Sequence, residues 1–160
     1  MATVAPDHFF FSDQDAYEIQ VHDPSGKLVR LIRLAWAPVA VTAADGQRYV
    51  EDMVEQMGSP EQAAAIRAQL GSLPLPEAFP PHGVLLADAL GFLWVEDFQR
   101  PGAENSAWNV FTPAGALVGR VTLPDRFSPL EIGADYVLGV GWDELNVEYL
   151  RMFGLSRAGG

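Results

Sequence analysis

The 160-residue sequence contains no cysteine. This absence excludes disulfide bonds, cysteine-ligated zinc, iron–sulfur clusters and thiol catalysis, but it leaves the compartment open. Positive charge is also scarce, because 10 Lys and Arg stand against 21 Asp and Glu, for a formal net charge of −11. Such a surface repels phosphate backbones, so we expect no nucleic-acid partner.

Long hydrophobic runs are missing too. No uninterrupted apolar run approaches roughly 18 residues, and residues 1–13 lack a basic region followed by an apolar core. We therefore expect a soluble chain without membrane insertion, cytoplasmic as given and periplasmic or extracellular if a leader has been trimmed. Only 19% of the residues are charged and 49% are apolar, a profile typical of one folded domain, here residues 1–160.

Motifs of catalysis are absent as well. The sequence has no Gly-x-Ser-x-Gly elbow, no Walker loop and no dinucleotide-binding fingerprint. The three histidines, His8, His22 and His82, are far apart and none has a metal-ligand spacing, so we expect each to be structural. We predict no catalytic residue and no cofactor.

The sequence does contain an internal repeat. Residues 17–32 and 106–121 align without a gap, and each runs from an alternating strand pattern into a four-residue turn, Asp23-Pro-Ser-Gly26 or Thr112-Pro-Ala-Gly115. Proline at the second turn position presets φ, and glycine at the fourth accepts a positive φ. Each segment is predicted to be a β-hairpin, with Gly26 and Gly115 at equivalent positions.

Two further regions show hairpin patterns. Asp88 and Gly91 bracket a turn between two apolar runs, which predicts four consecutive strands near residues 83–88, 91–98, 107–112 and 116–123, the content of one propeller blade. Residues 130–153 predict two or three more strands, with turns at 133–135 and 143–146. The predicted blade units span 7–34, 83–123 and 128–155, the first without an opening strand and the last without a closing one.

Between the first two units the apolar period changes to that of a helix. We predict an insertion at residues 43–81 with helices over 43–57 and 60–70. Ser59 suits an N-cap, Pro60 the first helical position and Gln62 a capping box. Prolines crowd residues 73–81, so this stretch should be extended.

Four strings carry a resemblance to a known family. They are Tyr-x-Ile-x-Val-x-Asp-Pro-x-Gly-x-Leu-Val-Arg-x-Ile-Arg at 17–33, Gly-x-Leu-Trp-Val at 91–95, Trp-x-Val-Phe-x-Pro-x-Gly-x-Leu at 108–117, and Asp-Tyr-Val-Leu-Gly-Val-x-x-Asp-Glu-Leu-x-Val-Glu-Tyr at 135–149. The chain resembles the C-terminal half of bacterial six-bladed β-propeller proteins of the NHL-repeat-like type. The resemblance implies a mainly β fold of about three propeller-like antiparallel blades with a two-helix insertion.

The resemblance is informative for fold and poor for function, because such propellers serve as binding scaffolds, sensors and occasionally enzymes. Propeller hydrolases of the lactonase kind hold a divalent metal with Glu, Asn and Asp, which makes Glu96, Asn105 and Asn109 the weak metal candidates here. Alternation along a strand puts Glu96 and Asp97 on opposite faces, so we predict no metal.

Three functions remain open. The first is a non-catalytic binding or protein-interaction module, which we favour. The second is a metal-dependent, lactonase-like hydrolase, and the third is a half-propeller fragment that self-assembles without a ligand. Since an isolated arc of three blades leaves apolar faces uncovered, we expect a homodimer that completes a ring, or another protein partner.

Overall fold

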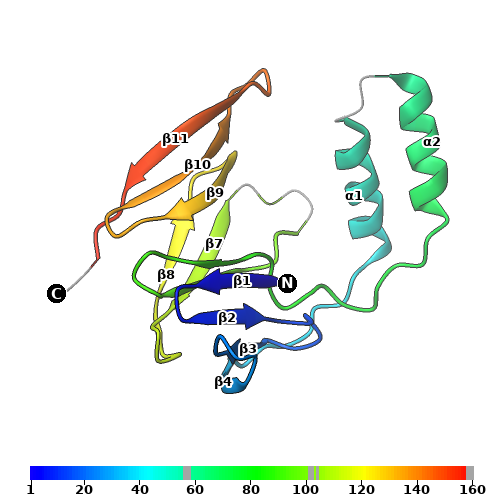
Figure 1. Cartoon of the computed structure of the whole chain (residues 1–160). Coiled ribbons are helices and arrows are strands. Elements are labelled where there is room, and N and C mark those ends of the chain that lie inside the picture. The colour runs from blue at the N-terminus through cyan, green and yellow to red at the C-terminus, as the bar shows by residue number, and fades with distance from the viewer. Residues whose placement is uncertain (56–58, 101–102, 104, 158–160) are drawn as a thin grey trace. The chain divides into compact units, whose positions relative to one another are not determined.

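The computed structural model describes residues 1–55, 59–100, 103 and 105–157. The described chain is mainly β, with three antiparallel sheets of four, four and three strands and two helices (Figure 1). It divides into two compact units. The sheet unit comprises Met1–Trp36, Pro81–Phe98 and Glu104–Gly160, and the helix unit comprises Ala37–Pro80 and Gln99–Ala103.

The first sheet is an antiparallel meander of four strands in sequence order. Its strands are β1 (Ala2–Ala5), β2 (His8–Phe11), β3 (Glu18–His22) and β4 (Leu28–Arg33). The prediction that this unit lacks an opening strand was wrong, because β1 pairs with β2 along its whole length. This strand is short, and Val4 is 75% exposed, so it has no buried apolar alternation that could reveal it.

The second and third sheets follow the same meander pattern. The second sheet contains β5 (Leu85–Ala87), β6 (Leu93–Glu96), β7 (Ser106–Phe111) and β8 (Leu117–Leu123), which confirms the four predicted strands. The third contains β9 (Phe127–Ile132), β10 (Tyr136–Trp142) and β11 (Glu148–Gly154), with β10 in the middle.

The predicted turn equivalence is confirmed. Gly26 has φ 85° and Gly115 has φ 84°, and their amides donate to the carbonyls of Asp23 and Thr112 at 2.9 and 2.8 Å. Each turn is followed by a register shift, as expected for a type I turn with a bulge. Two more hairpins close with the same backbone bonds, with Gly91 and Asn146 in the positive-φ position.

The first residue of each turn also stabilises it through its side chain. Asp23 Oδ1 accepts hydrogen bonds from the backbone amides of Ser25 and Lys27 at 2.9 and 3.1 Å. The hydroxyl of Ser25 donates to the same oxygen, and these bonds lower the pKa of the Asp23 carboxyl. Asp88 and Asp143 accept the corresponding amide bonds in their own turns. One local interaction therefore recurs in all three sheets.

The second sheet is the middle layer of the sheet unit. Its Leu93, Val95 and Phe111 are buried in one cluster with apolar residues of the first sheet. Its opposite face contributes Trp94 and Trp108, each 1% exposed, to a second cluster with residues of the third sheet. Both faces of the middle sheet are thus covered.

The helix unit contains α1 (Ala43–Glu55) and α2 (Pro60–Gly71), which pack against each other. The second predicted helix is confirmed, and Ser59 Oγ accepts from the Gln62 amide at 3.2 Å as its N-cap. The last two residues of the first predicted helix, 56 and 57, lie outside the described residues. Neither helix, as far as the structure describes them, is long and apolar enough to cross a membrane.

The proline-rich stretch is extended, as predicted, and it pairs with the segment that enters α1. The Val41 amide donates to the Glu77 carbonyl at 3.2 Å, and the Phe79 amide donates to the Val39 carbonyl at 2.9 Å. A β-bridge joins Ala40 and Ala78 between them. The entry and exit of the helical insertion therefore lie side by side.

Candidate functional site

The metal candidates are not brought to one site. Strand register places Glu96 opposite Trp108 and Asn109 opposite Val95, so Glu96 and Asn109 lie on opposite faces of the second sheet. The Glu96 carboxylate accepts from the Val84 amide at 3.2 Å, and burial raises its pKa. Asn105 is exposed just before β7. Among the described residues no three His, Asp or Glu side chains are grouped to hold a metal ion.

Asn109 has a different set of partners. Its amide donates to Asp97 Oδ1 at 2.7 Å and to the Tyr17 hydroxyl oxygen at 3.3 Å. The Asp97 carboxylate also forms an ion pair with Arg120. Burial raises the pKa of Tyr17, which keeps its hydroxyl protonated. This cluster joins the first sheet to the second, and its cation is the side chain of Arg120.

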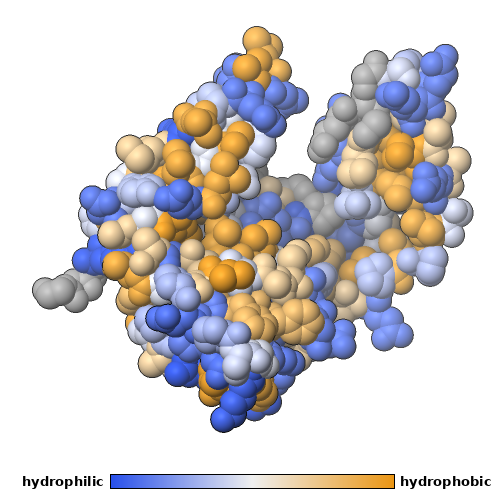
Figure 2. Space-filling view, viewed as in Figure 1, coloured by the Kyte–Doolittle hydropathy of each residue, from blue (hydrophilic) through white to orange (hydrophobic). Residues whose placement is uncertain are grey.

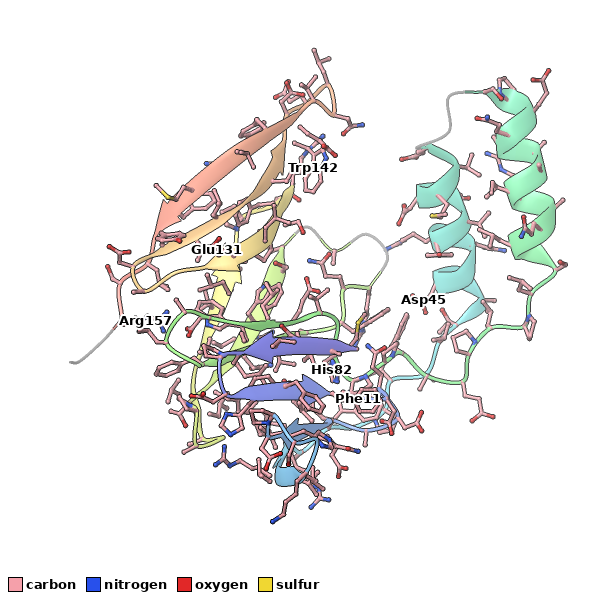
Figure 3. All side chains as sticks on the ribbon, viewed as in Figure 1. Phe11, Asp45, His82, Glu131, Trp142 and Arg157 are labelled. Carbon is pink, nitrogen blue, oxygen red and sulfur yellow. The ribbon has the colours of Figure 1, made fainter. Side chains whose placement is uncertain are left out.

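A buried serine–histidine pair was not anticipated from the sequence. Ser12 Oγ lies 2.8 Å from His82 Nε2, and the two residues are 1% and 0% exposed (Figure 3 labels His82). His82 Nδ1 lies 2.9 Å from the Gly83 carbonyl, which can only accept, so Nδ1 is the protonated nitrogen and Nε2 accepts from the serine. Burial lowers the pKa of His82. A serine hydroxyl bonded to a histidine nitrogen resembles the nucleophile and base of a hydrolase. Both residues are buried, however, so a substrate could not reach them. This location agrees with the structural role expected for His82.

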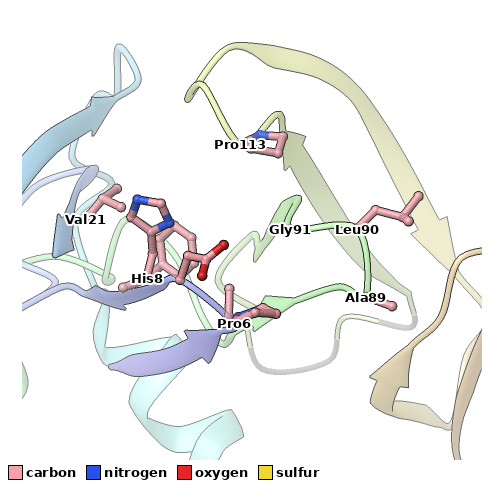
Figure 4. Close-up of a pocket in the computed structure, with 10 residues that line it drawn as sticks. Pro6, His8, Val21, Ala89, Leu90, Gly91 and Pro113 are labelled. Carbon is pink, nitrogen blue, oxygen red and sulfur yellow. The ribbon is translucent and has the colours of Figure 1, made fainter. Parts of the chain in front are cut away.

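The other two histidines are nearer the surface. His22 stacks on Phe9 with ring centroids 4.8 Å apart, and its Nδ1 lies 3.1 Å from the Gly26 carbonyl. His8 lines a cavity of about 270 Å³ (Figure 4). Pro6, Asp7, Leu90 and Pro113 lie around the same cavity. The polar residues that line this cavity lie at the surface, and within the described chain they share no hydrogen-bond network. The lining therefore does not indicate which kind of ligand the cavity could bind.

A second unanticipated group joins the second sheet to the C-terminal segment. Arg157 donates to Asp88 Oδ2 at 2.8 Å, and the Asp88 side chain is fully buried. The guanidinium also donates to the carbonyls of Gly133 and Ala134 and lies over the Phe92 ring at 5.2 Å. These contacts hold the end of the chain against two sheets and leave no donor set for a ligand.

The outer face of the third sheet is an open apolar surface. On β10, Leu138 and Val140 lie opposite Met152 and Leu150 of β11. Met152 is 66% exposed and Leu150 is 72% exposed. Apolar residues are visible at the surface along this sheet in Figure 2. The inner face of the same strands, with Val137, is buried against the second sheet.

The outer face of the first sheet is also open, with a more mixed character. Val4 lies opposite Phe9 on this face, and Phe11 is 41% exposed. Polar side chains lie beside them, among which Arg33 forms an ion pair with Glu18 at 2.6 Å. The stack of sheets therefore ends on an apolar face at the third sheet and on a mixed apolar and polar face at the first.

The third sheet also has an open edge. The first and second sheets each have four strands, whereas three are described in the third, and β11 forms one of its edges. Leu145 in the turn before β11 is 83% exposed and Val147 is 57% exposed. An edge strand with exposed apolar side chains is a template for pairing with another chain.

No family model matches the chain, and no curated protein matches it. The candidate site consists of the exposed apolar outer face of the third sheet and the open edge of β11. Exposed apolar patches and open strand edges are features that mark interaction surfaces.

Proposed function

We propose that this protein is a non-catalytic protein-interaction module whose three sheets are successive blades of a propeller-like array. The observation that carries the proposal is the exposed apolar outer face of the third sheet. Three similar meanders stacked face to face support the propeller reading, as do contacts of β5 with both β1 and β9, the opening strands of the three sheets.

A second copy of the chain is the preferred partner. Two copies related by a twofold axis would place the outer face of each third sheet on the outer face of the other copy's first sheet, which completes six blades. Apolar burial contributes roughly 25 cal/mol per Å², so two such contacts provide a substantial driving force against the entropy cost of association.

The test is the mass in solution. Light scattering at tens of micromolar should report twice the 17.4 kDa chain mass. Leu150→Lys, on the outer face of the third sheet, should convert this species to the monomer. The matched control is Leu73→Lys in the helix unit, where Leu73 is 56% exposed, and it should leave the mass unchanged. A wild-type monomer at this concentration would reject the ring.

A further inference from the structure

The last strands of the two four-stranded sheets, β4 and β8, have a similar composition. The strands β4 and β8 both begin Leu-Val after their turn, and both contain apolar residues together with arginine, Arg30 and Arg33 in β4 and Arg120 in β8. Arg33 of β4 forms an ion pair with Glu18 on the neighbouring strand, and Arg120 of β8 forms one with Asp97. The closing strand thus adds both an apolar side chain and a cation to the sheet.

The third sheet has the acidic and apolar groups that such a strand would meet. Glu148, Leu150 and Met152 share the outer face of β11, on an edge that no described strand covers. The Glu148 carboxylate accepts only a 3.2 Å bond from Trp142 Nε1 within the described chain, and no cation is paired with it there (Figure 3 shows Trp142). The third sheet therefore has apolar residues on its edge strand β11, but no described arginine-containing strand pairs with the outer edge of β11.

We propose that the edge of β11 binds an extended segment of a partner protein, about six residues long, that is mainly apolar and contains at least one arginine or lysine. The segment would add a fourth strand, with backbone hydrogen bonds supplying affinity and the alternate side chains supplying specificity. The net charge of −11 favours approach of a basic segment. This inference rests on the proposed interaction function, and it specifies the kind of partner that the edge of β11 would bind.

The same edge is poorly suited to pair with itself. Antiparallel pairing of β11 with β11 of a second copy over the full Glu148–Gly154 length would place Arg151 opposite the same arginine. Like charges directly opposite one another destabilise a strand pair. A basic segment of another protein places its cations near Glu148 instead.

The probe is a fluorescent peptide with the sequence of residues 27–34, Lys-Leu-Val-Arg-Leu-Ile-Arg-Leu, which contains one of the chain's own closing strands. Anisotropy with the full chain should show saturable binding. A peptide N-methylated at alternate residues keeps the side chains but loses one edge of backbone donors, and it should bind at least tenfold more weakly. Glu148→Lys should weaken the unmodified peptide at least fivefold. The matched control Glu144→Lys, in the exposed turn, should change the affinity less than twofold.

Hydrogen exchange identifies where the peptide binds. Amides of β11 should gain protection when the peptide is added. Protection at β3 instead, or equal binding of the N-methylated peptide, or no binding at all, would overturn the inference. The result is separable from the ring, because β11 keeps an outer edge in the monomer and in the proposed dimer, and the mass is measured independently of the peptide.

Discussion

The middle and third sheets both have a strongly apolar inner strand, but the surroundings of these strands differ. In the middle sheet, β6 reads Leu-Trp-Val, and all three residues are buried because sheets cover both faces. In the third sheet, β10 reads Tyr-Val-Leu-Gly-Val-Gly-Trp, which is equally apolar at successive positions, yet only one of its faces is covered in this chain. Strands with continuous apolar sequences are typical of sheets covered on both sides. The third sheet therefore combines the apolar sequence of a covered sheet with an outer face on which Leu150 and Met152 stay exposed among the described residues.

The largest expected effect comes from truncating an apolar side chain in each sheet. Trp108→Ala should lower the free energy of unfolding by about 3–5 kcal/mol, because it opens a cavity between the second and third sheets. Met152→Ala, at a residue 66% exposed, should cost less than about 0.5 kcal/mol in dilute solution. Urea unfolding measures both changes. A cost for Met152 comparable to that for Trp108 would show that its face is covered within the chain itself.

The next effect compares two turn aspartates. Asp88→Asn removes a fully buried carboxylate that pairs with Arg157, and it should cost about 2–4 kcal/mol because the guanidinium loses its partner. Asp143→Asn should cost less than about 1 kcal/mol, because the turn is exposed and the asparagine side-chain oxygen can still accept the two turn amide bonds. Thermal unfolding of the two variants provides the comparison. Adding Arg157→Ala to Asp88→Asn should cost less than the two single changes combined, and full additivity would rule out their coupling.

A smaller difference in stability is expected between substitutions at two positive-φ turn residues, Gly115 of the second sheet and Asn146 of the third. Gly115→Ala should cost about 1–2 kcal/mol, because a Cβ there would lie 2.9 Å from Arg30 Cδ and would strain a φ of 84°. Asn146→Gly, at φ 59°, should be neutral or stabilising by a few tenths of a kcal/mol. Chemical denaturation checks both values. A destabilising Asn146→Gly would indicate that the asparagine side chain, which accepts from Arg126, holds the turn.

The smallest expected effect is a pH dependence of stability around Ser12 and His82, which the third sheet should not share. Burial lowers the pKa of His82, so the unfolded chain binds a proton more readily than the folded one. The associated stability is present above the unfolded value near 6.5 and is lost as the pH falls toward the folded pKa. Hydrogen exchange at pH 5.5 and 7.5 should show loosening around Ser12 and His82, absent in His82→Gln. The third sheet contains no histidine and should not change.

Local features of this fold were predictable, and contacts between distant residues were not. The Asp-Pro-Ser-Gly26 and Thr-Pro-Ala-Gly115 turns are specified by neighbouring residues, so aligning them predicted two hairpins correctly. The Ser59 cap is equally local. The Ser12–His82 pair joins residues 70 positions apart, and Asp88 and Arg157 are 69 apart. Each of these is an ordinary surface-type residue in the sequence, and only the stacking of the sheets buries it.

The strand pairing at the base of the helix unit has an evolutionary consequence. Ala40 and Ala78 form an antiparallel bridge, which places their Cα atoms about 5 Å apart. A loop whose two ends already touch can be lengthened, shortened or exchanged with little change in the path of the chain on either side. The two helices therefore form an exchangeable insertion, and a single genetic deletion that leaves two residues between Ala40 and Ala78 would remove both of them.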